Sequence, residues 1–134
     1  MLSCGLQIRF DTHFLKVISD TYEVFPSIQN PATLTLTVVV PAYNEERRLP
    51  KMLAECTVYL EERTKSEGGF TYEIILADDG SKDSTTQVGL EWTKKLGPNR
   101  FRVLTLMENR GKGGAVTEGI LRARYIYNYT ASMF

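Results

Sequence analysis

The feature that most constrains the fold is an alternation of short apolar runs with longer amphipathic segments. Residues 34–40, 72–77 and 101–107 are apolar and rich in β-branched side chains, which is typical of strands buried on both faces. Each run is followed by apolar residues at helical spacing, and Gly68-Gly69 and Gly97-Pro98 end the first two of these segments. This β-α-β-α-β-α order predicts a three-layer α/β/α, Rossmann-like fold with a mainly parallel sheet.

The length of 134 residues is enough for one domain. We expect residues 1–33 to be an irregular lead-in or linker, residues 34–127 the folded unit, and residues 128–134 a divergent tail. In the strand order 3-2-1-4 that such sheets adopt, the strand at 34–40 lacks a neighbour on one side. Its edge is therefore expected to be bare, and prone to aggregation, unless the lead-in or the tail covers it.

Composition excludes several classes of protein. Lys plus Arg and Asp plus Glu both number 16, so the chain has no net positive charge that would attract nucleic acid. The two cysteines are far apart and form no CxxC pair, which argues against a disulfide framework or a zinc site. No run reaches the roughly 18 apolar residues of a membrane span. The first 20 residues are interrupted by charges and make a poor secretory signal, so we expect this chain alone to be cytosolic.

Three polar loops follow the three predicted strands: PAYNEERR at residues 41–48, DDGSKDS at residues 78–84 and ENRGKGG at residues 108–114. Ligands of parallel α/β sheets bind at the carboxyl ends of the strands, so these loops should converge at one site. Asp83 or Ser84 is able to cap the helix that follows the second loop.

The three loops together contain the groups that bind a nucleotide. Tyr43 offers an aromatic face for a base, Asp78 and Asp79 offer acceptors for a base N–H, and Arg110 and Lys112 lie among glycines where phosphate oxygens can approach. Each element alone has a simpler explanation: the tyrosine packs, and Asp-Asp-Gly-Ser forms a solvated turn. An unrelated Rossmann-like dehydrogenase or regulator would need a glycine fingerprint after the first strand, where this chain has Pro-Ala-Tyr-Asn-Glu.

The segments VVVPAYNEERRLP, YEIILADDGSKDST and VLTLMENRGKGGAV resemble the nucleotide-binding half of the inverting family 2 glycosyltransferases. The likeness runs from about Phe25 to about Gly119, with the motifs in the family's order and spacing. The third motif, NRGKGGA, narrows the resemblance toward the dolichyl-phosphate β-glucosyltransferases within the family. Polyprenyl-phosphate mannosyltransferases share the first two motifs and are the near alternative.

This resemblance implies that residues 34–127 are the UDP-binding half of a GT-A domain, with UDP-glucose as donor, dolichyl phosphate as acceptor, and Mg²⁺ or Mn²⁺ as cofactor. It places the site at the cytoplasmic face of the endoplasmic reticulum membrane, in protein N-glycosylation. By similarity, Asp79 accepts the uracil N–H, Asp78 supports the same loop, and Gly80 lets the chain turn close to the nucleotide. The remaining implied UDP-binding residues lie around the base and ribose or near the diphosphate: Pro41, Tyr43, Glu45, Arg110 and Lys112.

The chain departs from the family in three respects. The D-x-D metal motif is expected on a fourth strand, but the last aspartate is Asp83. The family's catalytic base and acceptor region lie beyond that motif, and the first 20 residues do not supply the usual membrane anchor. The expectation is therefore a truncated enzyme in which no metal ligand or catalytic residue is identifiable. The alternative is that the chain is a remnant that binds UDP but has no catalytic activity.

Overall fold

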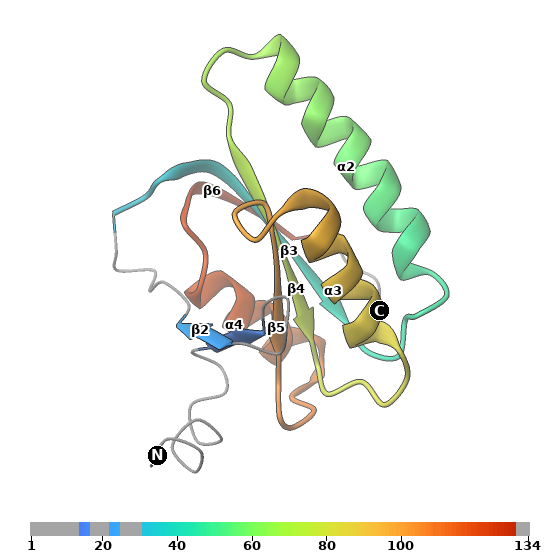
Figure 1. Ribbon diagram of the computed structural model, residues 1–134. Helices are drawn as coiled ribbons and strands as arrows, with labels where there is room; N and C mark the ends of the chain where they lie inside the picture. The colour runs from blue at the N-terminus through green and yellow to red at the C-terminus, as the bar shows by residue number, and fades with distance from the viewer. Residues whose placement is uncertain (1–13, 17–21, 25–30, 131–134) are drawn as a thin grey trace.

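The computed structural model describes residues 14–16, 22–24 and 31–130 of the chain (Figure 1). Helices and strands follow one another in the order β1 (Phe14–Lys16), β2 (Tyr22–Val24), β3 (Leu34–Ala42), α2 (Leu49–Ser66), β4 (Tyr72–Asp78), α3 (Thr85–Leu96), β5 (Phe101–Thr105), α4 (Gly111–Leu121) and β6 (Tyr125–Thr130). The three strands predicted from apolar runs are β3, β4 and β5, and a helix follows each of them.

The strands form one six-stranded sheet in the order β2-β1-β5-β4-β3-β6. Pairing is parallel between β5 and β4, between β4 and β3, and between β3 and β6, whereas β1 runs antiparallel to both β2 and β5. The prediction of an α/β fold with a mainly parallel sheet is therefore confirmed. The central order β5-β4-β3-β6 is the expected 3-2-1-4 arrangement. The strands β4 and β5 are added in turn on one side of β3, and β6 is then added on its other side.

The second edge of β3, which was expected to be bare unless the lead-in or the tail covers it, is covered by β6. The two strands are in parallel register from Leu34 beside Tyr125 to Val39 beside Thr130. The expected boundary between residues 127 and 128 falls inside β6. The segment YIYNYT is uncharged and rich in aromatic and β-branched residues, a composition that favours a strand once an open edge lies beside it.

The lead-in also differs from the irregular segment that the sequence suggested. Residues 14–16 and 22–24 pair as a short antiparallel ribbon, and Lys16 of β1 lies in register with Val103 of β5. This ribbon extends the sheet beyond β5. A three-residue strand is too short to show the alternating pattern by which strands are recognised from sequence. The ribbon joins the sheet because β5 offers β1 an edge to pair with.

Helices cover both faces of the sheet, as Figure 1 shows, with α2 and α3 on one face and α4 on the other. The larger core lies beneath α2 and α3 and includes Leu53, Ile74, Leu76, Trp92 and Phe101. The smaller core lies beneath α4 and contains Val39, Ile75, Ala77, Leu104, Leu106, Ala115 and Ala123. Among the described residues, no helix combines the length and the hydropathy that a membrane crossing requires.

Candidate nucleotide site

The polar loops meet at the carboxyl edge of the sheet, around the end of β4. The backbone N–H of Asp79 donates to the carbonyl of Ala42 at 2.9 Å, which ties the second loop to the end of β3. The backbone N–H of Leu106 donates to the carbonyl of Asp78 at 2.9 Å, and the N–H of Arg110 donates to Asp79 Oδ1 at 2.7 Å. These three bonds confirm that the loops after β3, β4 and β5 converge on the two adjacent aspartates.

The carboxylates of Asp78 and Asp79 serve different loops. Asp78 Oδ1 accepts the backbone N–H of Ser81 at 3.0 Å, and its Oδ2 accepts the hydroxyl of Thr86 in α3. Asp78 is completely buried, so it braces the second loop and the start of α3 from inside. Asp79 instead reaches the segment that precedes α4, through Arg110. Successive side chains of a strand point to opposite faces, which explains how two adjacent like charges are kept apart.

One oxygen of Asp79 has no partner among the residues that the structure describes. The side chain is 0 % exposed, and its Oδ1 is used by Arg110, while Oδ2 is buried and makes no hydrogen bond. A buried charged acceptor without a donor is costly, because the carboxylate has given up water without replacing it. Such an orphan oxygen at the carboxyl edge of a parallel sheet indicates an acceptor reserved for a ligand donor.

Gly80 allows the second loop to pass close to the third. Its φ of 73° lies in the left-handed region, where residues with a Cβ are strained. A Cβ added there would lie 3.4 Å from the backbone N of Asn109, so the two loops are in close contact. Gly80 therefore contributes by its conformation and its small size.

The first two loops are joined by hydrogen bonds that the sequence did not reveal. Asn44, which adopts a φ of 54°, donates its backbone N–H to Ser81 Oγ at 2.9 Å and accepts the N–H of Lys82 through Oδ1 at 2.8 Å. Glu46 donates its N–H to Asp83 Oδ2 at 3.2 Å and accepts the N–H of Ser84 at 2.9 Å. Four hydrogen bonds thus hold the two loops together.

The structure shows where the three residues that the resemblance places around the base and ribose lie. The carboxylate of Glu45 is almost buried and is engaged by the guanidinium of Arg48, which donates from Nε at 2.7 Å and from Nη2. The backbone N–H of Glu45 donates to Thr85 Oγ1 at 2.8 Å. Pro41 is a buried residue of β3, in register with Ala77. Tyr43 is half-buried at the end of the strand, where an aromatic face can cover a base.

The two cations of the third loop are placed differently. Arg110 donates from its guanidinium to Glu118 Oε1 at 2.7 Å, so its charge is directed along α4. Lys112 lies exposed in the first turn of α4 and has no ion pair within the described residues. The positive end of a helix dipole and an unpaired ammonium group together attract an anion such as phosphate.

Asp83 stabilises the start of α3, and this role predicts a pH dependence. Burial acts to raise the pKa of its carboxyl, but hydrogen bonds from Thr85 and Glu46 outweigh that effect and hold the pKa below the usual 3.8. Ionised Asp83 therefore stabilises the fold above the unfolded-state pKa, and this contribution is lost as pH falls through the folded-state pKa.

We expect the difference in free energy of unfolding between the native chain and Asp83→Asn to shrink as pH is lowered from about 7 to about 3. Urea unfolding at several pH values measures this difference. A difference that stays constant over this range would contradict the assigned role, because a protonated aspartate and an asparagine make similar hydrogen bonds.

The described residues contain no group of three or more His, Cys, Asp or Glu side chains that could hold a metal ion. The carboxylates of the site are instead paired with backbone amides, hydroxyls or arginine. The expectation of Mg²⁺ or Mn²⁺ therefore stays a prediction that rests on the resemblance.

A mainly parallel sheet with an unpartnered carboxylate oxygen and a helix N-terminus at its carboxyl edge is typical of an α/β protein that binds a ligand at that edge. Residues 37–129 match the glycosyl transferase family 2 domain. The chain therefore belongs to glycosyl transferase family 2, and the dehydrogenase or regulator alternative is wrong. The matched region continues past Gly119, where the recognised likeness ended, and includes most of β6.

Several curated relatives are similar to this chain. A protein named dolichyl-phosphate beta-glucosyltransferase from Drosophila melanogaster is 50 % identical over 114 residues, which cover 85 % of this chain and 33 % of the relative. Its namesake from Homo sapiens is 52 % identical over 102 residues, covering 76 % and 32 % of the two chains. The namesake from Dictyostelium discoideum is 48 % identical over 126 residues, covering 91 % and 38 %. The chain thus spans about a third of the length of these relatives.

Proposed function

We propose that this chain forms the UDP-binding part of a glucosyltransferase that transfers glucose from UDP-glucose to dolichyl phosphate. The observation that carries the proposal is the buried, unpartnered Oδ2 of Asp79 at the carboxyl edge of the sheet. The names of the relatives, which share about half of their residues with this chain over the matched region, support the choice of sugar and acceptor.

The proposed partner of Asp79 Oδ2 is the ring N–H of uracil. Uracil presents one N–H between two carbonyls, and an ionised carboxylate is a strong acceptor for it. Asp79 can bind the base and keep its present role at once, because Oδ1 holds the N–H of Arg110 while Oδ2 remains for the ligand. Tyr43, at the end of β3, is the proposed stacking surface for the base.

The diphosphate is proposed to lie at the N-terminus of α4. Gly111, Lys112 and Gly113 form the first turn of this helix and are exposed. The N–H of Gly111 donates to Asn109 Oδ1 at 3.1 Å, so the backbone N–H groups of Lys112 and Gly113 and the ammonium group of Lys112 are the donors proposed for phosphate oxygens. Arg110 is held by Glu118 in the structure, which leaves Lys112 as the cation of this turn that is free to meet the diphosphate. No step of this binding is routed through a metal ion.

Binding requires a local movement, because Asp79 Oδ2 makes no contact with solvent. The exposed residues 107–109, which lie between β5 and α4 and precede Arg110, are the part of the site that is able to move aside. We propose that the nucleotide enters by displacing this segment while the first two loops, joined by Asn44 and Glu46, stay in place. The acceptor proposal also implies work at a membrane surface, on the cytoplasmic face of the endoplasmic reticulum.

Replacing Asp79 by asparagine should weaken UDP binding about tenfold or more, since a hydrogen bond to a charged group contributes about 1.5–3 kcal/mol. The asparagine carbonyl can still accept the N–H of Arg110, but its amide would then present a donor to the uracil N–H. Asp83→Asn is the matched control, because Asp83 binds Thr85 and Glu46 rather than the proposed base. Isothermal calorimetry with UDP measures both variants.

The choice of base provides a second arm of the same experiment. Cytosine carries an acceptor where uracil carries the ring N–H, so native Asp79 should prefer UDP to CDP, and Asp79→Asn should reduce or reverse that preference. Equal affinity of the native chain for UDP and CDP would contradict the assignment of Asp79 to the base. Loss of UDP binding in Asp83→Asn alone would place the base elsewhere.

A further inference from the structure

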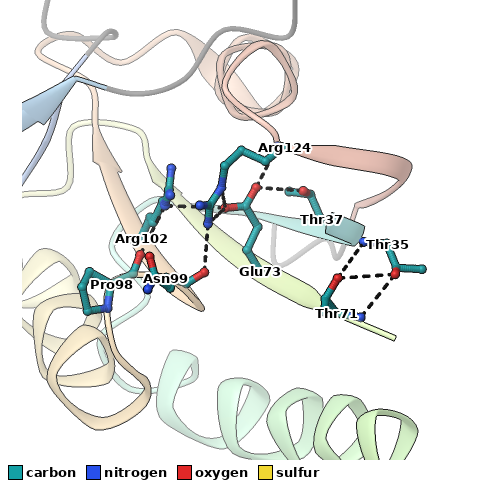
Figure 2. Close-up of polar contacts among 8 residues, drawn as sticks. All are labelled: Thr35, Thr37, Thr71, Glu73, Pro98, Asn99, Arg102 and Arg124. Atoms are coloured by element: carbon teal, nitrogen blue, oxygen red, sulfur yellow. Dashed lines mark hydrogen bonds and ion pairs between the residues drawn. The ribbon is translucent and has the colours of Figure 1, made fainter. Parts of the chain in front are cut away.

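Glu73 is a buried carboxylate near the start of β4, at the opposite end of the strand from Asp78 and Asp79, and Figure 2 shows the polar side chains around it. Glu73 is 0 % exposed and accepts four hydrogen bonds: from Thr37 Oγ1 at 2.9 Å, and from the N, Nε and Nη2 atoms of Arg124 at 2.9, 3.0 and 2.8 Å. The Nε of Arg102 lies 3.5 Å from Glu73 Oε2. The carboxylate is completely buried, and the side chains of its two arginine partners are 10 % and 19 % exposed.

Glu73, the second residue of β4, and Asp79, the residue directly after the strand, are directed toward the same side of the sheet, where they bind the segments on either side of α4. Side chains alternate along a strand, so residues six apart point the same way. Ile75 and Ala77, which lie between them, belong to the core beneath α4. Both carboxylates therefore face the layer that contains α4, one from each end of β4.

The two carboxylates hold the two ends of α4. Asp79 accepts the backbone N–H of Arg110, the residue before the helix, and Glu73 accepts the backbone N–H of Arg124, just after it. Between these points the helix lies very close to the sheet: a Cβ added to Gly119 would lie 2.4 Å from Val39 Cγ1. A helix in such close contact moves as a rigid body, so a displacement of one end is transmitted to the other.

We propose that Glu73 is a positioning residue for the nucleotide site, and that it acts through α4. By fixing Arg124 it fixes the C-terminal end of the helix, and the helix in turn keeps Arg110 and Lys112 in place beside Asp79. This proposal rests on the proposed function for its effect on UDP, but the mechanical link between Glu73 and Arg110 does not depend on any ligand. The two claims can therefore be tested separately.

The mechanical link is tested by hydrogen exchange at the Arg110 amide, followed by NMR in the absence of ligand. Glu73→Gln keeps the shape of the side chain but removes the charge that holds the guanidinium groups. Its control is Leu60→Ala, which creates a cavity in the core between α2 and the other face of the sheet. The exchange rates of the two variants are compared at urea concentrations that give both the same free energy of unfolding. We expect faster exchange at Arg110 in Glu73→Gln than in Leu60→Ala. Equal exchange at that amide would overturn the proposal.

The effect on binding is tested by calorimetry with UDP on the same two variants. Coupling between distant sites typically changes affinity by about threefold to tenfold, and we expect a loss of this size in Glu73→Gln but none in Leu60→Ala. Unchanged UDP affinity in Glu73→Gln would overturn the positioning role even if UDP binds well. If the native chain does not bind UDP, the proposed function fails, while the exchange at Arg110 still decides the mechanical link.

Arg124→Lys is the milder variant if Glu73→Gln does not fold. Lysine keeps the positive charge and the backbone N–H that Glu73 accepts, but it loses the two-pronged contact through Nε and Nη2. We expect the same changes as in Glu73→Gln, in the same direction and smaller. Arg110 exchange and UDP affinity that both match the Leu60→Ala control would overturn the proposal.

Discussion

Replacing Glu73 by methionine should lower the free energy of unfolding by about 3–5 kcal/mol, the usual cost of removing one partner from a buried ion pair. The substitution leaves the guanidinium groups of Arg102 and Arg124 under α4 without their carboxylate, and their side chains are only 10 % and 19 % exposed. The hydroxyl of Thr37 also loses its acceptor. Chemical unfolding in urea, followed by circular dichroism, measures the change.

A matched triple variant separates the loss of charge balance from the loss of packing. Replacing Glu73, Arg102 and Arg124 together by Met, Leu and Leu removes all three charges and retains apolar volume. Such replacements are often neutral or stabilising, so the triple variant should recover much of the stability that the single change removes. A single variant that loses less than about 1 kcal/mol would mean that water solvates the arginines in solution, against the burial seen here.

Replacing Phe101 by alanine should lower the free energy of unfolding by about 3–5 kcal/mol, the usual cost of truncating a large buried aromatic side chain. Phe101 is 0 % exposed at the start of β5, and its ring centroid lies 6.4 Å from that of Trp92 in α3. The substitution therefore removes packing contacts between α3 and the sheet that this helix covers. Urea unfolding and the thermal midpoint both report this change.

Val58→Ala is the control for that variant. Val58 lies in α2 and is 60 % exposed, so its truncation removes little buried surface and should change the free energy of unfolding by less than about 0.5 kcal/mol. A similar loss for the two variants would show that the α3 side of the sheet is not the close-packed core described here.

The meeting of the three polar loops was predictable because each loop directly follows a predicted strand. The acids at 78 and 79 follow an apolar strand directly, and a parallel sheet brings the ends of its strands to one edge. The period of two along a strand also predicts that adjacent carboxylates face opposite ways. The structure adds their separate uses: Asp78 braces its own loop through Ser81 and Thr86, whereas Asp79 holds Arg110 and keeps one oxygen unpartnered.

What the sequence determined by itself is the local pattern: apolar strands, amphipathic helices and polar loops, and with them the α/β class. These features depend on the spacing of neighbouring side chains, and each segment shows its own spacing. The two outer additions to the sheet were decided by tertiary structure, because β6 pairs only where β3 offers an open edge and β1 only where β5 does. The same holds for Glu73, which in sequence is one acid in a strand and meets Arg124 from 51 residues away. Long-range contacts of this kind carry no local periodic signal, and the fold creates them when α4 packs against β4.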